Sequence, residues 1–193
     1  MSEQSPLSLG TEDIKKLLMR YAVPAIVAMT AASLYNMMDS IFIGHGVGAL
    51  GIAGLAVTFP FINLAAAFGS LVGVGASTLV SVKMGQKDLK SAEAVLGNVL
   101  LLNTVIGFLF MTVCLIFLDP ILYFFGASAD TLPYARDYMK VILYGNLITH
   151  IYMGLNEVMR ASGYPQRAMM ATLFAVLING VLNALFIFVL DMG

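Results

Sequence analysis

Five long apolar runs, separated by short polar stretches, dominate the sequence. A helix needs about 20 mainly apolar residues to cross the hydrocarbon core of a bilayer, which is about 30 Å thick. Each run reaches this length, so the pattern predicts an all-α, multi-pass membrane protein. We expect a polar N-terminal segment over residues 1–13 and a transmembrane domain over residues 14–193, with spans at about 17–43, 52–82, 94–118, 134–159 and 169–190.

The first two predicted spans are longer than a bilayer requires, so we expect them to tilt or bend. Pro24 and Pro60 lie inside these spans. A proline removes one backbone hydrogen bond from a helix and crowds the preceding turn. The sequence therefore predicts a kink in the first helix at Pro24.

Basic residues are concentrated on one side of the predicted membrane. Short cytoplasmic loops carry an excess of lysine and arginine, which predicts a cytoplasmic N-terminus in the plasma (inner) membrane. Five spans then bring the chain to its end on the opposite side, directly after a span, so we expect an N-terminal piece of a longer protein. Eight of the ten basic residues lie on the N-terminal side: Lys15, Lys16, Arg20, Lys83, Lys87, Lys90, Arg160 and Arg167.

The composition agrees with a membrane protein and excludes other classes. Hydrophobic residues make up 60% of the chain, charged residues 11%, and the mean hydropathy is +0.90, which is unlike a soluble domain. A net charge of −1 provides no basic surface for nucleic acid. The single cysteine forms no internal disulfide, and His150 has no second histidine or cysteine at ligand spacing. We expect no metal, no cofactor and no enzymatic activity.

Asp39 is the most informative residue, because it is an ionisable group inside the first apolar run. Placing a carboxylate in hydrocarbon is costly. Asn36 lies three residues earlier and shares a helix face with Asp39, with Tyr35 beside that face. One reading is a proton or cation site with an amide neighbour. The other is an acid that contacts headgroup water, since Asp39 lies only about 6 Å from the predicted helix end.

Asn179 and Asn183 lie four residues apart, on one face of the last predicted span. Amide side chains at membrane depth usually form hydrogen bonds with a neighbouring helix. The alternative is that both line the same cavity as Asp39, and we expect the first and last spans to approach each other there. The same two readings apply to four further polar residues in the spans: Asn103, Asn146, Thr149 and His150.

Several motifs together resemble the multidrug and toxic compound extrusion (MATE) transporters. Each fragment is short, but the set extends over nearly the whole chain from Leu17 to Leu190. The matching segments are Tyr21-Ala-Val-Pro24, Ser33-Leu-Tyr-Asn-Met-Met-Asp39-Ser-Ile-Phe-Ile-Gly44, Gly46-Val-Gly48, Thr58-Phe-Pro60, Gly73-Val-Gly-Ala-Ser77, Phe125-Gly-Ala-Ser128 and Met159-Arg-Ala-Ser-Gly163.

The resemblance implies a twelve-helix transporter of two six-helix lobes, of which this chain would be the first five helices of the N-terminal lobe. Asp39 matches the acidic residue of the family's first helix, Pro24 its kink-forming proline, and Asn179 and Asn183 the polar pair of the fifth helix. Several prokaryotic members have an aspartate at the second position of this pair. Asn183 therefore removes one ionisable group and leaves Asp39 as the main titratable candidate.

The implied function is a secondary active antiporter that exports organic cations or drugs in exchange for H⁺ or Na⁺. Its partners would be a small cationic substrate, the lipid bilayer and the remaining helices of the transporter. One alternative is a lipid-linked oligosaccharide flippase, which should carry cationic residues in the middle of its spans, where this sequence has none. Another alternative is a non-transporting membrane scaffold subunit.

Overall fold

The computed structural model describes residues 13–185, and within them every regular element is an α-helix. The predicted all-α fold is therefore confirmed. The helices run in the order α1 (Ile14–Gly46), α2 (Ala49–Gly85), α3 (Leu89–Ile116), α4 (Leu118–Phe124), α5 (Leu132–Ala161) and α6 (Pro165–Ala184).

Local sequence signals set the helix boundaries. The Asp13 carboxylate accepts a hydrogen bond from the Lys15 amide at the start of α1, and Asp88 does the same for the Ser91 amide at the start of α3. Such side chains satisfy amides that have no partner in the first turn of a helix. Gly163 separates α5 from α6 at φ 93°, a backbone conformation that glycine adopts without steric cost.

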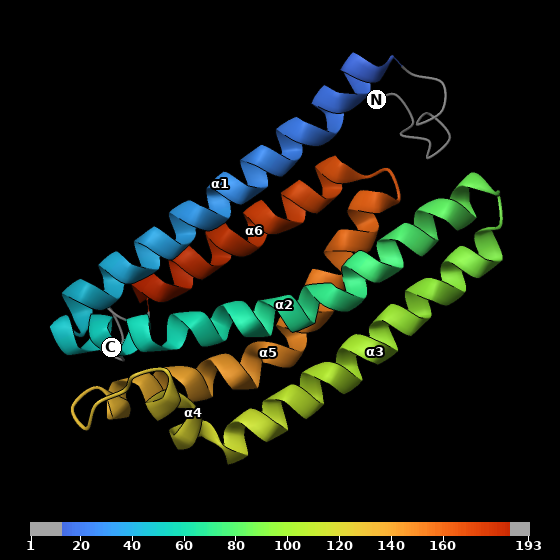
Figure 1. Cartoon of the computed structure of the whole chain (residues 1–193). Helices are drawn as coiled ribbons and strands as arrows, with labels where there is room; N and C mark the ends of the chain where they lie inside the picture. Colours follow the sequence, from blue (N-terminus) through green and yellow to red (C-terminus); the bar gives the residue numbers. More distant parts are fainter. Residues whose placement is uncertain (1–12, 186–193) are drawn as a thin grey trace.

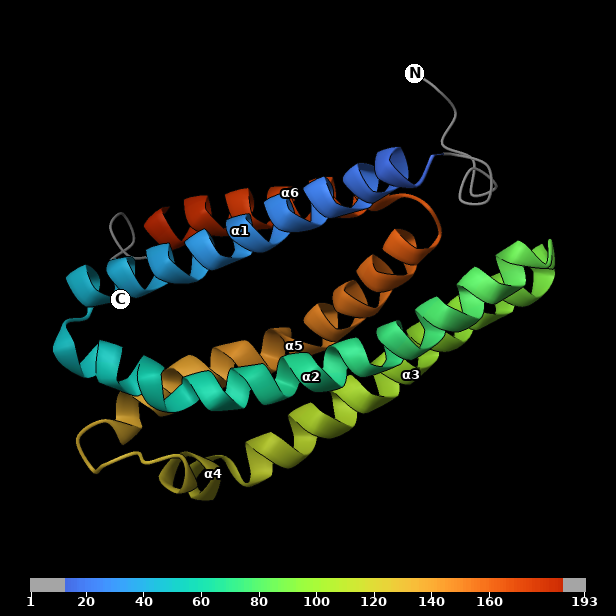
Figure 2. The same cartoon turned by 45° about the horizontal axis from the view of Figure 1, so that its top comes forward.

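The helices form two groups that are visible in both views (Figures 1 and 2). In one group α1 packs mainly against α6, although the two helices are far apart in sequence. In the other group α5 packs against α2 and α3, and α4 lies against the beginning of α5. The helix pair α1–α6 is connected to the other group through the smaller contacts of α6 with α5 and of α1 with α2.

Glycines allow the helices of the second group to pack closely. A Cβ atom added at Gly73 of α2 would lie 2.8 Å from the Cα atom of Gly154 in α5. Small residues at such crossings let backbones approach each other, which favours helix association in lipid. The buried apolar core continues on both sides of this crossing, with Val80, Val99 and Val158 on one side and a larger cluster around Phe61, Leu122, Met139 and Leu143 on the other.

Four helices, α1, α2, α3 and α6, are long and apolar enough to cross a membrane. The fourth predicted span, 134–159, is also a helix, since α5 has 30 residues and extends about 45 Å at 1.5 Å per residue. It is less apolar because it carries Asn146, His150 and Asn156, all of which are buried. These polar residues face helix neighbours, whereas Val141, Tyr144 and Ile148 on another face of α5 are exposed. Residues 1–12 and 186–193 of the predicted segments lie outside the described residues.

Helix α1 continues through Pro24, which is buried, and the predicted kink there stays a prediction. A proline removes one hydrogen bond from a helix, and here the turns on both sides of Pro24 keep the helix continuous.

Candidate functional site

Asp39 lies where three helices meet. Its Oδ1 atom accepts a hydrogen bond of 2.9 Å from Nδ2 of Asn183 in α6, and its Oδ2 atom accepts one of 3.4 Å from the hydroxyl of Tyr138 in α5. The carboxylate is therefore directed into the bundle and connects α1 with α5 and α6. The hydrogen bond to Asn183 joins α1 to α6. The sequence predicts this contact between the first and last spans.

Tyr35 belongs to the same cluster, whereas Asn36 does not. The Tyr35 side chain is half-buried and lies near enough to interact with Asp39 and Asn183. Asn36 is exposed, and its backbone carbonyl accepts a hydrogen bond from the Ser40 hydroxyl. At 3.6 residues per turn, Tyr35 lies about 40° from Asp39 around the helix and Asn36 about 60° on the other side. Only the Tyr35 side of α1 faces the cluster.

Asn179 is the second predicted site residue that lies apart from Asp39. Its side chain is exposed, and within residues 13–185 it makes no hydrogen bond to Asp39. It lies one turn before Asn183, about 6 Å closer to the start of α6. The structure thus brings Asp39, Asn183 and Tyr35 together and leaves the side chains of Asn36 and Asn179 exposed.

Tyr138 is the site residue that sequence reasoning missed. It lies among charged residues at the start of α5, a position typical of an aromatic side chain at the membrane interface. Its contact with Asp39 spans 99 residues of sequence, and no motif or periodicity predicts it. The only available signal was a hydroxyl group near the end of a span at the same membrane level as Asp39.

Neutral donors, and not a basic side chain, hold the Asp39 carboxylate. The two basic residues near Tyr138 are paired elsewhere, since Arg136 forms two hydrogen bonds with Asp119 and Lys140 lies 3.6 Å from Asp137. Within the described residues no ion pair involves Asp39. A carboxylate without a fixed cation is available to a proton, a metal cation or an organic cation.

A second polar network connects α5 and α6 near the opposite end of the bundle. The Asn156 amide donates to the carbonyl of Ala168 at 3.1 Å, and Arg160 donates to the Asn156 oxygen at 3.0 Å. Arg160 also forms an ion pair with Glu157 at 3.7 Å. These contacts fix the turn between the helices, and none of them involves the Asp39 cluster.

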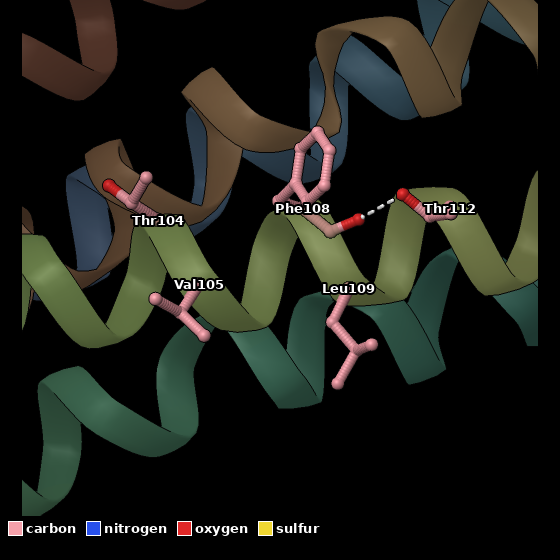
Figure 3. Close-up of a pocket in the computed structure, with 5 residues that line it drawn as sticks. All are labelled: Thr104, Val105, Phe108, Leu109 and Thr112. Carbon is pink, nitrogen blue, oxygen red and sulfur yellow. Dashed lines mark hydrogen bonds between the residues drawn. The ribbon is translucent and has the colours of Figure 1, made fainter.

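Among the described residues, no cluster of metal-ligating side chains adds to this site. No group of three or more histidine, cysteine, aspartate or glutamate side chains that could hold a metal ion occurs between residues 13 and 185. A shallow apolar pocket lies on α3 alone (Figure 3), and its two threonine hydroxyls donate to carbonyls of their own helix. This surface includes none of the residues around Asp39; its lining residues are Thr104, Val105, Phe108, Leu109 and Thr112.

Comparison with known proteins identifies the family. The sequence matches MatE over residues 24–185, which is most of the chain. The chain belongs to the MatE family. The resemblance to MATE transporters that the sequence motifs indicate is therefore confirmed, and the match extends over all the helices that form the site.

Named relatives and solved structures agree with this assignment. The multidrug export protein MepA of Staphylococcus haemolyticus is 28% identical over 188 residues, which are 97% of this chain and 42% of MepA. The MATE multidrug transporter DinF-BH is 34% identical, with a TM-score of 0.89 over 95% of this chain and 41% of that one. A MOP superfamily transporter from Pyrococcus furiosus is 27% identical, with a TM-score of 0.89 over 100% of this chain and 42% of that one.

Two facts follow from these matches. The relatives are named as exporters or transporters and not as enzymes, which supports the expectation that this chain is not an enzyme. The chain spans about 42% of the length of this MepA. Together with its apolar helices, the matches make it a multi-pass membrane protein of the MATE type.

Proposed function

We propose that this chain forms part of a secondary active antiporter that exports organic cations or drugs in exchange for H⁺ or Na⁺. The observation that carries the proposal is the Asp39 carboxylate, held between α1, α5 and α6 by Asn183 and Tyr138 without a basic partner among the described residues. The multidrug transporters among its relatives support the substrate class.

The side chains around Asp39 suit a carboxylate that binds a cation and a proton in turn. An ionised Asp39 attracts a cation, and its protonation removes that attraction. Asn183 carries both an amide donor and a carbonyl acceptor, and the Tyr138 hydroxyl also donates and accepts. Both partners can therefore hydrogen-bond to either protonation state of Asp39. The cluster connects α1 and α6 to α5, so a change of charge there acts on the contact between the two helix groups.

We also propose that the protein lies in the plasma (inner) membrane with its N-terminus in the cytoplasm. The start of α1, the α2–α3 turn and the α5–α6 turn all lie at one end of the bundle (Figure 1). This end carries Lys15, Lys83, Lys90 and Arg167. A concentration of basic residues at one membrane face supports a cytoplasmic position for that face.

Transport by the whole protein in liposomes tests the proposal. A fluorescent organic cation would be followed after imposing a pH gradient, a Na⁺ gradient or no gradient. The proposal predicts substrate movement against its own gradient when one of the two ion gradients is present, and none without it. Equal fluxes in all three conditions would contradict ion-coupled antiport. No flux in any condition would contradict transport and would favour the scaffold alternative.

A further inference from the structure

The short helix α4 is apolar on both of its faces. It lies at the end of the bundle opposite the start of α1 and the α2–α3 and α5–α6 turns (Figures 1 and 2). Leu118 and Leu122, one turn apart, are buried and belong to the larger apolar cluster. The opposite face carries Tyr123 and Phe124, which are both exposed, Phe124 to 84%. A helix that borders water normally has polar residues on its outer face, so the outer face of α4 is suited to a different surrounding.

The charge of α4 is neutralised by a side chain of α5. Asp119 is the one charged residue of α4. Its carboxylate accepts two hydrogen bonds from the Arg136 guanidinium, and the one from Nε to Oδ1 measures 2.7 Å. Paired hydrogen bonds between a guanidinium and a carboxylate fix the two groups in one geometry. The pair therefore holds α4 against the start of α5, and the outer face of α4 keeps aromatic side chains without a charge.

The exposed face of α4 continues an exposed apolar stripe of α3. Helix α3 is long and apolar enough to cross a membrane. Large apolar side chains that are exposed recur along it every three or four residues, a spacing that places them on one side of a helix. The stripe extends to the end of α3 and the residue before α4, and consists of Leu101, Val105, Phe108, Leu109, Val113, Ile116 and Phe117. A surface suited to lipid along a spanning helix thus leads directly into α4.

We propose that α4 lies in the interface between the bilayer and water, with Phe117, Tyr123 and Phe124 inserted among the lipid headgroups. Aromatic residues are favoured at this depth, because the ring contacts apolar chains while a polar group such as the tyrosine hydroxyl stays in water. The turn after α4 has the exposed polar residues Ser128 and Asp130, as expected on the water side of the interface. The placement concerns how the protein sits in the membrane and does not depend on transport.

The contact of α4 with lipid bears on the Asp39 cluster through the first turns of α5. Arg136 contacts Asp119 of α4, and Tyr138, two residues later, contacts Asp39 of α1. At about 100° per residue the two side chains leave α5 about 200° apart, so this part of α5 lies between α4 and α1. The position of α4 in the interface thereby fixes the depth of Tyr138 in the membrane.

Tryptophan fluorescence of the whole protein in liposomes tests the proposal. Tryptophan is absent from this sequence, and the emission of the unmodified whole protein would be subtracted. Phe124→Trp would be compared with Ala129→Trp, the matched control at an exposed position of the turn after α4. Quenching would be measured with aqueous iodide and with phospholipids that carry bromine either near the headgroup or near the end of the acyl chains. Tyr123→Trp, on the same exposed face as Phe124, provides a second variant.

The depth of the quencher decides the outcome. The expected result is that lipid brominated near the headgroup quenches Phe124→Trp more than lipid brominated near the chain end. Iodide should quench Phe124→Trp several-fold less than it quenches Ala129→Trp. Equal iodide quenching of the two variants, without an effect of either brominated lipid, would place α4 in water and overturn the proposal. Stronger quenching by the bromines near the chain end would place α4 in the hydrocarbon core and would overturn it as well.

Discussion

Gly73 lies at a close approach of α2 to α5, and its replacement by alanine should separate these helices. The added Cβ would lie 2.8 Å from the Cα atom and 3.1 Å from the carbonyl oxygen of Gly154, and 3.2 Å from Cβ of Glu157. The two closest atoms belong to the backbone, so no change of side-chain rotamer can relieve the contact.

The size of the effect follows from these distances. Non-bonded carbon atoms are most stable at about 3.5–4.0 Å, so the helices must move apart by about 1 Å. Overpacking of this kind typically costs about 1–3 kcal/mol. For a chain of this length each kcal/mol lowers the melting temperature by about 2–4 °C. Gly73→Ala should therefore lower it by several degrees, despite the higher helix propensity of alanine.

Gly75→Ala is the matched control, because no atom lies within 4 Å of its Cβ position on the same helix. It should leave the melting temperature unchanged or raise it. Thermal unfolding of both variants in the same detergent, followed by the loss of the monodisperse peak in size-exclusion chromatography, measures the difference. Equal melting temperatures of Gly73→Ala and Gly75→Ala would refute the close crossing of α2 and α5.

Three further predictions concern single contacts. Asn183→Leu should reduce gradient-driven export strongly, while Asn179→Leu should leave it near the wild-type rate, because only Asn183 contacts Asp39; equal losses in liposome transport would contradict this. Tyr138→Phe should reduce export less than Asn183→Leu, since its hydrogen bond to Asp39 is the longer one at 3.4 Å, and a complete loss at matched expression would contradict it. Hydrogen bonds from the Ser91 side chain and backbone, with the nearby Lys83, lower the pKa of Asp88. The capping contact therefore stabilises the protein above the usual Asp pKa of about 3.9 and is lost as the pH falls through the lower folded pKa. Asp88→Ala should lower the melting temperature at neutral pH. The difference in melting temperature between the variant and the wild type should shrink as the pH falls through the folded pKa of Asp88, and a difference that does not depend on pH would contradict the assignment.

The sequence predicts the helices well because membrane spans depend on a simple requirement. A backbone in hydrocarbon must satisfy its own hydrogen bonds, so a long apolar run is almost always a helix. The same requirement predicts that polar groups at membrane depth find each other, which is how Asp39 and Asn183 could be paired from sequence. The less apolar α5 is the helix for which composition alone is weakest, since its polar residues are buried within the bundle.

The contacts that the sequence does not predict depend on how each helix is rotated about its own axis relative to its neighbours. Spacing places Asn36 and Asp39 on one face, but it does not indicate which edge of that face touches α6. The contact of Tyr138 with Asp39 depends on how α5 lies relative to α1, which the spacing of residues within one helix does not indicate.

Export by the Asp39→Asn variant of the whole protein tests the central claim most directly. Asparagine keeps the shape of the side chain and much of its hydrogen bonding but removes its charge and its titration. Substrate flux into liposomes would be measured under the ion gradient that drives the wild-type protein, with Asp130→Asn in the exposed turn before α5 as the control. The account predicts that Asp39→Asn abolishes gradient-driven flux while folding and the control variant stay at the wild-type level. Wild-type flux in the Asp39→Asn variant would show that Asp39 is not the cation site.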